Sequence, residues 1–63
     1  LNADASYDRA VADVLNAAAA APYVIVQATS RAAARFERLV RAHRTSVEII
    51  QPNEEETYII GKS

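Results

Sequence analysis

The sequence predicts a small α+β domain with the element order α-β-α-β-β. Two segments have apolar residues at helical spacing, three short runs are rich in β-branched and aromatic residues, and turn residues separate these segments. A chain of 63 residues, 51% of them hydrophobic, has room for one core, so residues 1–63 form a single domain. The chain lacks methionine, which is consistent with a processed product or a domain cut from a longer protein.

The first helix is predicted over residues 6–20. Ser6 is a candidate N-cap, and Pro22 disfavours helical geometry at the residue before it, so the helix should end near Ala21. The apolar positions that recur at helical spacing are Tyr7, Val11, Val14, Leu15 and Ala18. A first strand follows directly over residues 23–28, and its first half is apolar on both faces, as in a strand that lies in an interface.

The second helix is predicted over residues 31–43, with Ser30 as its cap. Its apolar face carries Ala32, Phe36, Leu39, Val40 and His43. A second strand over residues 46–51 is closed by a proline, and a third strand over residues 57–60 ends at Gly61.

Two sheet orders fit this element order. The β-α-β crossover makes the first two strands parallel, and the third strand returns antiparallel either at the outer edge or between the other two. The third strand is apolar on both faces through residues 58–60, which favours the central position. The predicted fold is therefore a split β-α-β domain: a three-stranded mixed sheet of order 1-3-2, with both helices on one face.

The sheet face turned away from the helices is the first candidate site. If the valines of strand one face the helices, the opposite parity is too apolar to remain in water and predicts a partner interface. The candidate residues are Tyr23, Ile25, Ile50, Tyr58 and Ile60, with Thr57 and Ile59 replacing the last two if strand three has the other parity. Because Ile60 lies within the predicted central strand, we expect Ile60→Ala to unfold the domain or to abolish association.

The arginines of the second helix are the second candidate site, for nucleic acid or another anionic partner. The series comprises Arg31, Arg35, Arg38, Arg41 and Arg44. The alternative is a solvated helix face balanced by Glu37 and by acidic residues of the first helix. The net charge of −1 and the absence of interleaved aromatic residues favour this alternative.

No residue pattern predicts catalysis, a metal site or a cofactor site. The chain has no cysteine, His43 is its only histidine, and the single glycine, Gly61, excludes a glycine-rich phosphate loop. His43 fits a boundary residue of the second helix better than a proton shuttle. Consecutive glutamates at residues 54–56 point to alternate sides, which fits a solvated hairpin better than calcium or magnesium ligation.

The sequence therefore predicts a non-enzymatic domain that binds itself or another protein through its outer sheet face, with nucleic-acid binding as the alternative. The six-to-one excess of arginine over lysine hints at a bacterial or phage source. No apolar stretch is long enough to span a membrane, and the N-terminal residues lack the positive region and apolar core of a signal peptide. We expect a cytoplasmic location, although a cysteine-free chain fits other compartments too.

Overall fold

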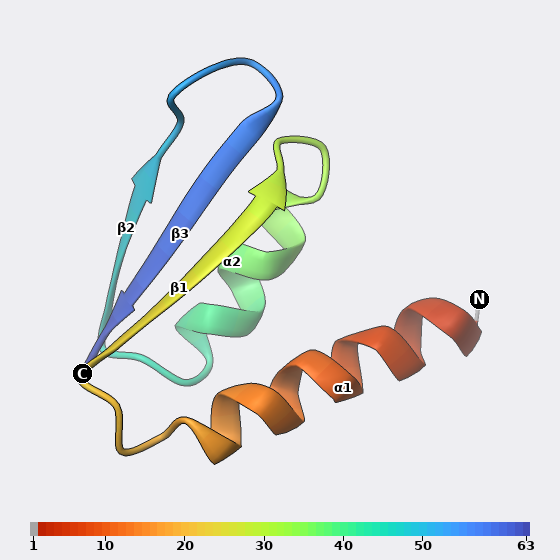
Figure 1. The fold of residues 1–63 in the computed structure, drawn as a ribbon. Coiled ribbons are helices and arrows are strands. Elements are labelled where there is room, and N and C mark those ends of the chain that lie inside the picture. The colour runs from red at the N-terminus through yellow and green to blue at the C-terminus, as the bar shows by residue number, and fades with distance from the viewer. Residues whose placement is uncertain (1) are drawn as a thin grey trace.

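All five predicted elements are present in the computed structural model, which describes residues 2–63 (Figure 1). They are α1 (Asn2–Ala17), β1 (Tyr23–Thr29), α2 (Ala33–Arg41), β2 (Ser46–Ile50) and β3 (Glu56–Lys62). The Cα atoms extend over 31 × 30 × 13 Å. A thickness of 13 Å accommodates one sheet layer and one helix layer.

The sheet has the predicted order, β1-β3-β2. β3 pairs antiparallel with both neighbours, and Ile60 lies opposite Ile25 on one side and Glu48 on the other. β1 and β2 run parallel to each other as predicted, but they are never neighbours, so every ladder of the sheet is antiparallel.

α1 begins earlier than predicted. It starts at Asn2, so Ser6 lies inside the helix and the prediction that it caps the helix is wrong. At its C-terminal end the helix finishes at Ala17, and turn hydrogen bonds continue the coil, with the Ala21 N–H donating to the Ala18 carbonyl over 2.9 Å. Pro22 then redirects the chain into β1, as expected from its effect on the preceding residue.

α2 is shorter than predicted, and Ser30 does not cap it. Ala32 occupies the N-cap position without a side-chain cap. The Ser30 N–H donates to the Glu55 carbonyl at the end of the β1–β3 ladder, and its hydroxyl lies 2.9 Å from Thr57 Oγ1. Ser30 is therefore a turn residue directly after β1 whose contacts are with Glu55 and with Thr57 of β3, and not with the start of α2.

β3 is longer than predicted, because Gly61 continues the strand instead of ending it. Gly61 faces α2 at close quarters: an added Cβ would lie 2.6 Å from Val40 Cγ1 and 2.7 Å from Arg44 Cγ. Glycine is therefore needed here for the approach of α2 to the sheet and not for its backbone conformation. None of the residues 2–63 has a positive φ angle.

The core lies between β3 and α2. Ile59 and Val40 are fully buried, and Leu15 of α1 and Ala28 of β1 complete the buried cluster. α1 joins this cluster mainly through α2: the Tyr7 and Phe36 rings meet edge to face with their centroids 5.9 Å apart. α2 therefore covers one face of the sheet, and α1 packs against α2 on that same side, as predicted.

A buried arginine joins three segments at one corner of the fold. Arg44 is only 8% exposed, and its Nη2 donates to the Ala18 carbonyl over 2.8 Å. Its Nη1 donates to the Ala21 carbonyl and to Ser63 Oγ. The guanidinium therefore fastens the C-terminal end of α1 to the end of the chain, beyond β3.

Candidate protein interface

The buried positions of the strands determine which side chains point away from the helices. In β3, Thr57, Ile59 and Gly61 are buried, so Tyr58 and Ile60 occupy the opposite side of the sheet. The register places Ile25 beside Ile60 and Ile50 beside Tyr58. This settles the parity of strand three that the sequence leaves open. The five predicted interface residues share one surface, here called the outer face: Tyr23, Ile25, Ile50, Tyr58 and Ile60.

The outer face exposes large apolar side chains on the two flanking strands. Ile25 is 66% exposed, Tyr23 60% and Ile50 44%, whereas Tyr58 and Ile60 on the central strand are half-buried between these neighbours. In Figure 1, α2 lies behind the sheet and α1 lies beyond β1, so no described element covers the outer face. Three strands therefore present one continuous apolar surface to solvent.

The polar side chains of the outer face are paired with each other. Lys62 Nζ lies 3.0 Å from Glu48 Oε1, and Gln27 Nε2 donates to Glu56 Oε2 over 2.7 Å. These pairs flank the row of Ile25 and Ile60, because Glu48 lies opposite Ile60 and Gln27 lies two residues from Ile25. A partner that covers the outer face would meet hydrogen-bonded polar groups around an apolar centre, as in many protein interfaces.

The structure does not bring the five arginines into one stripe. Arg31 lies in the turn before α2, Arg38 is exposed, and Arg44 is buried at the corner described above. Arg35 Nε lies 2.6 Å from Asp8 Oδ1, and Arg41 Nε lies 2.9 Å from Glu37 Oε2.

Arg35 links the two helices and does not present a free cation. Besides its ion pair with Asp8, its guanidinium carbon lies 5.5 Å from the centroid of the Tyr7 ring. Because Asp8 and Tyr7 both belong to α1, these contacts hold α1 against α2. The Arg35 and Arg41 ion pairs correspond to the balanced helix face that the sequence raised as the alternative.

His43 follows α2 and is half-buried, with Nδ1 3.1 Å from the Leu39 carbonyl oxygen. This contact lies within its own helical turn and points to no other titratable group. The boundary role that the sequence favours is consistent with this position.

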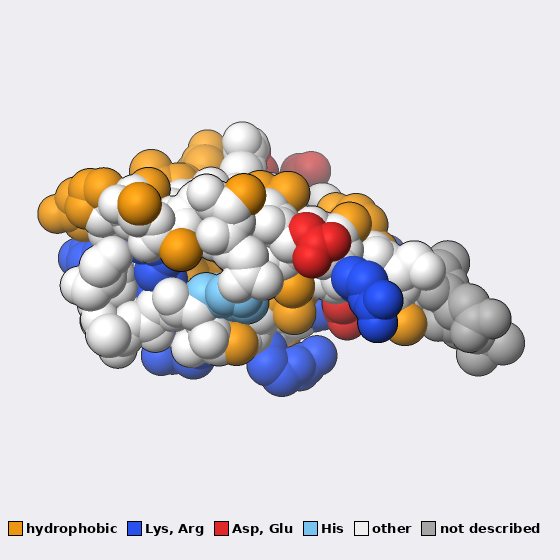
Figure 2. All heavy atoms as spheres, turned by 90° about the horizontal axis from the view of Figure 1, so that it is seen from below, with side chains coloured by type: hydrophobic (Ala, Val, Ile, Leu, Met, Phe, Trp, Pro, Cys, Tyr) orange, Lys and Arg blue, Asp and Glu red, His pale blue; other side chains and the backbone are white. Residues whose placement is uncertain are grey.

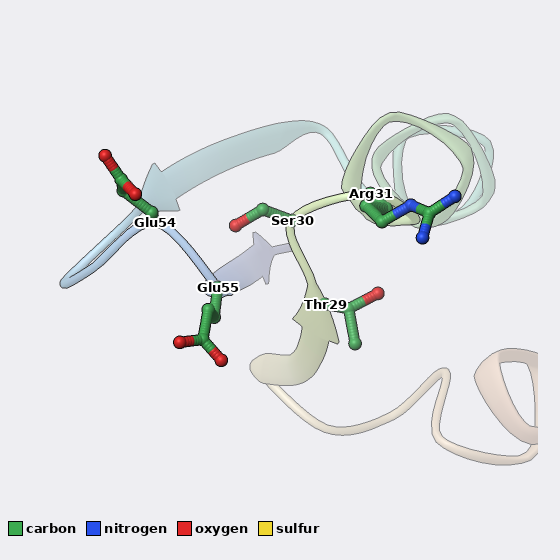
Figure 3. Close-up of a pocket in the computed structure, with 5 residues that line it drawn as sticks. All are labelled: Thr29, Ser30, Arg31, Glu54 and Glu55. Carbon is green, nitrogen blue, oxygen red and sulfur yellow. The ribbon is translucent and has the colours of Figure 1, made fainter.

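A shallow hollow of about 400 Å³ lies where β1 and the β2–β3 turn meet (Figure 3). Its lining consists of Thr29, Ser30, Arg31, Glu54 and Glu55. Figure 3 shows the Arg31 and Glu54 side chains pointing in opposite directions, so no pair of catalytic groups converges there.

The acidic turn is organised by Asn53, whose Oδ1 accepts hydrogen bonds from the N–H groups of Glu55 and Glu56. Within the described part of the chain, no group of three or more acidic or histidine side chains is placed to hold a metal ion. In that same part, no helix has the length and apolar character needed to cross a bilayer.

Sequence reasoning identified the outer face but not the buried role of Arg44. Arg44 follows Arg41 at ordinary helical spacing, and its partners lie 26, 23 and 19 residues away in the chain. No local pattern distinguishes such a residue from a solvated arginine.

No protein-family model matches the chain, and neither a curated protein nor a solved structure shows significant similarity to it.

Proposed function

We propose that this domain is a non-enzymatic self-association module that uses its outer face to bind a second copy. The observation that carries the proposal is the uncovered apolar surface shared by β1, β3 and β2. Large contiguous apolar surfaces of this kind are uncommon on monomeric proteins and usually mark interaction sites.

A second copy fits this surface better than a charged ligand does. The outer face presents aliphatic and aromatic side chains at its centre, and two of its charged groups, Glu48 and Lys62, pair with each other. Two such faces are compatible at their apolar centres, where the side chains are uncharged.

The expected association is reversible. Complete burial of a large apolar side chain contributes about 1.5–3 kcal/mol. In a pair of copies, six side chains that are already half-covered would together contribute about 5–9 kcal/mol. Association costs about 4–15 kcal/mol in lost translational and rotational freedom. Because the two terms are similar, we expect concentration-dependent dimerisation and not a permanent dimer.

Sedimentation equilibrium from micromolar to millimolar chain concentration tests the proposal. We expect the mean mass to rise with concentration in the parent chain. Ile50→Lys places a charge on the outer face and should weaken association at least about tenfold, which corresponds to roughly 1.4 kcal/mol.

Val14→Lys is the matched control, since Val14 is also exposed but lies on α1 in the helix layer. It should associate like the parent. A parent chain that stays monomeric over the whole range, or equal losses in Ile50→Lys and Val14→Lys, would contradict the use of the outer face.

A further inference from the structure

The outward edge of β1 offers hydrogen-bonding groups in addition to the outer face. The Ser63 N–H donates to the Pro22 carbonyl over 3.2 Å, and the Ser30 N–H donates to the Glu55 carbonyl over 2.9 Å. In an antiparallel ladder the residues that exchange hydrogen bonds alternate. The even-numbered residues of β1 therefore direct their backbone groups to β3, and Tyr23, Ile25 and Gln27 direct theirs away from the sheet.

Within residues 2–63, no backbone hydrogen bond reaches the N–H or carbonyl groups of Tyr23, Ile25 and Gln27. β1 also lacks the usual protection of an edge strand, because the segment Tyr23–Thr29 contains no charged residue and no proline. The opposite edge is different: β2 is five residues long, carries Glu48 and is followed closely by Pro52. The edge of β1 is thus the one suited to accept another strand.

α1 leaves the residues of the outward edge of β1 exposed. Tyr23 and Ile25 are 60% and 66% exposed, and α1, which lies beyond β1 on the side away from β2 in Figure 1, packs mainly against α2. Val14 of α1 is 68% exposed, although its neighbour Leu15 is buried. Figure 2 views the molecule from the side that carries α1, and hydrophobic side chains reach the surface between the charged ones there.

The sequence of β1 is complementary to itself when it is reversed. Val24 and Val26 flank Ile25 symmetrically, so an antiparallel copy centred on Ile25 places Ile25 opposite Ile25 and Val24 opposite Val26. In this register Tyr23 faces Gln27 of the other copy. Every pair that would exchange hydrogen bonds then consists of residues whose backbone groups point outward, and the central pairs, formed by Val24, Ile25 and Val26, are β-branched, which favours pairing.

We propose that β1 pairs antiparallel with β1 of a second copy about a two-fold axis at Ile25, which joins two three-stranded sheets into one of six strands. The unpaired backbone groups define the occupant as an extended strand, and the symmetric Val24-Ile25-Val26 segment identifies it as this chain. The inference goes beyond the proposed function, because it uses the edge of the sheet and not its outer face.

The two self-contacts are compatible with each other. A two-fold axis for edge pairing is perpendicular to the sheet, whereas a two-fold axis for face-to-face packing lies parallel to it. Two perpendicular two-fold axes that intersect generate a closed assembly of four copies. The edge contact alone therefore yields a dimer, and both contacts together yield a tetramer.

Gln27→Pro compared with Gln27→Ala tests the edge contact. Both changes remove the Gln27 side chain and its contact with Glu56. Only the proline removes the outward N–H, and it leaves the ladder to β3 intact because that N–H takes no part in it. By sedimentation equilibrium, we expect Gln27→Pro to weaken the edge contact at least about tenfold and Gln27→Ala to retain it.

Amide exchange in the unmodified chain gives a second measurement that does not depend on a variant's folding. The amides of Tyr23, Ile25 and Gln27 should exchange rapidly in dilute solution and become protected as concentration rises. Face-to-face association alone would leave these three amides exchanging rapidly at every concentration.

The outcomes separate the two proposals. If Gln27→Pro associates like Gln27→Ala and the three amides stay unprotected, the edge inference is overturned, whereas a loss in Ile50→Lys still supports the outer face. If Gln27→Pro weakens association and Ile50→Lys does not, the result supports the edge contact and contradicts the use of the outer face. A chain that remains monomeric, but whose edge amides become protected by an added peptide of sequence Tyr23–Thr29, would overturn the second copy as occupant and assign the edge to a strand of another protein.

Discussion

At the scale of single residues, we expect the loss of the Arg44 side chain to lower the unfolding free energy much more than the loss of the nearby Arg41. Arg44→Ala would remove the guanidinium that donates to the Ala18 and Ala21 carbonyls and would empty a buried volume at the corner of the fold. A hydrogen bond to a charged group contributes about 1.5–3 kcal/mol. We expect a loss of about 2–4 kcal/mol in unfolding free energy, measured from urea midpoints.

Arg41→Ala is the control for Arg44→Ala, because Arg41 is exposed and pairs only with Glu37 in its own helix. Its cost should remain within about 0.5 kcal/mol. Equal effects of the two substitutions would show that the corner contacts of Arg44 contribute nothing to stability.

Two adjacent isoleucines of β3 should respond differently to truncation. Ile59 is fully buried against α2, so Ile59→Ala should cost about 2–5 kcal/mol whatever the protein concentration. Ile60 lies on the outer face and is half-buried, so Ile60→Ala should cost about 1 kcal/mol in the dilute monomer.

The sequence predicts a severe loss of stability for Ile60→Ala. In the isolated chain we expect that severe loss for Ile59→Ala instead. At high concentration Ile60→Ala should also reduce association, because its side chain then lies in the contact. Urea denaturation at two protein concentrations measures both effects. An Ile60→Ala loss as large as that of Ile59→Ala in dilute solution would contradict the assigned parity of β3.

At the scale of elements, α1 is held in place by a small set of contacts with α2. The Arg35–Asp8 ion pair is partly exposed and should contribute about 0.2–1 kcal/mol, and the contact of Arg35 with the Tyr7 ring about 0.5–1 kcal/mol. Arg35→Ala should therefore cost about 1–2 kcal/mol and increase amide exchange along α1.

Arg38→Ala is the matched comparison, since Arg38 is exposed on the same helix. It should leave both stability and exchange in α1 unchanged within about 0.5 kcal/mol. A double-mutant cycle with Asp8→Ala isolates the ion pair, and a coupling of zero would show that the pair does not hold α1.

The strands were easier to predict than the helix ends. The β-branched runs of β1 and β2 mark those strands directly, and the two-sided apolar character of β3 correctly placed it in the centre. The predicted helix caps were wrong because serine also occurs inside helices and at the ends of strands. Ser6 lies within α1, and the Ser30 N–H donates to the Glu55 carbonyl beside the β1–β3 ladder. A local capping signal does not reveal which of these environments the chain will supply.

At the scale of the whole molecule, the candidate interface was predictable up to one ambiguity. The sequence identified Tyr23, Ile25 and Ile50 but left the parity of β3 open, since Tyr58-Ile59-Ile60 is apolar on both faces. The packing of α2 resolves this parity, because only a residue without a side chain at position 61 permits the approach of Val40. The ion pairs that immobilise Arg35 and Arg41 depend on the placement of side chains in three dimensions, which periodicity does not specify.

The central position of β3 also has a consequence for the order in which the protein is made. β1 and β2 do not contact each other in the sheet, and both hydrogen-bond only to β3, which is synthesised last of the three strands. While a ribosome is still extending the chain, the helices can form but no ladder can. The apolar strands therefore emerge without a partner, and the sheet assembles in a single late step once Glu56–Lys62 has left the exit tunnel. Molecular chaperones that recognise extended apolar segments would encounter Tyr23–Thr29 throughout that interval.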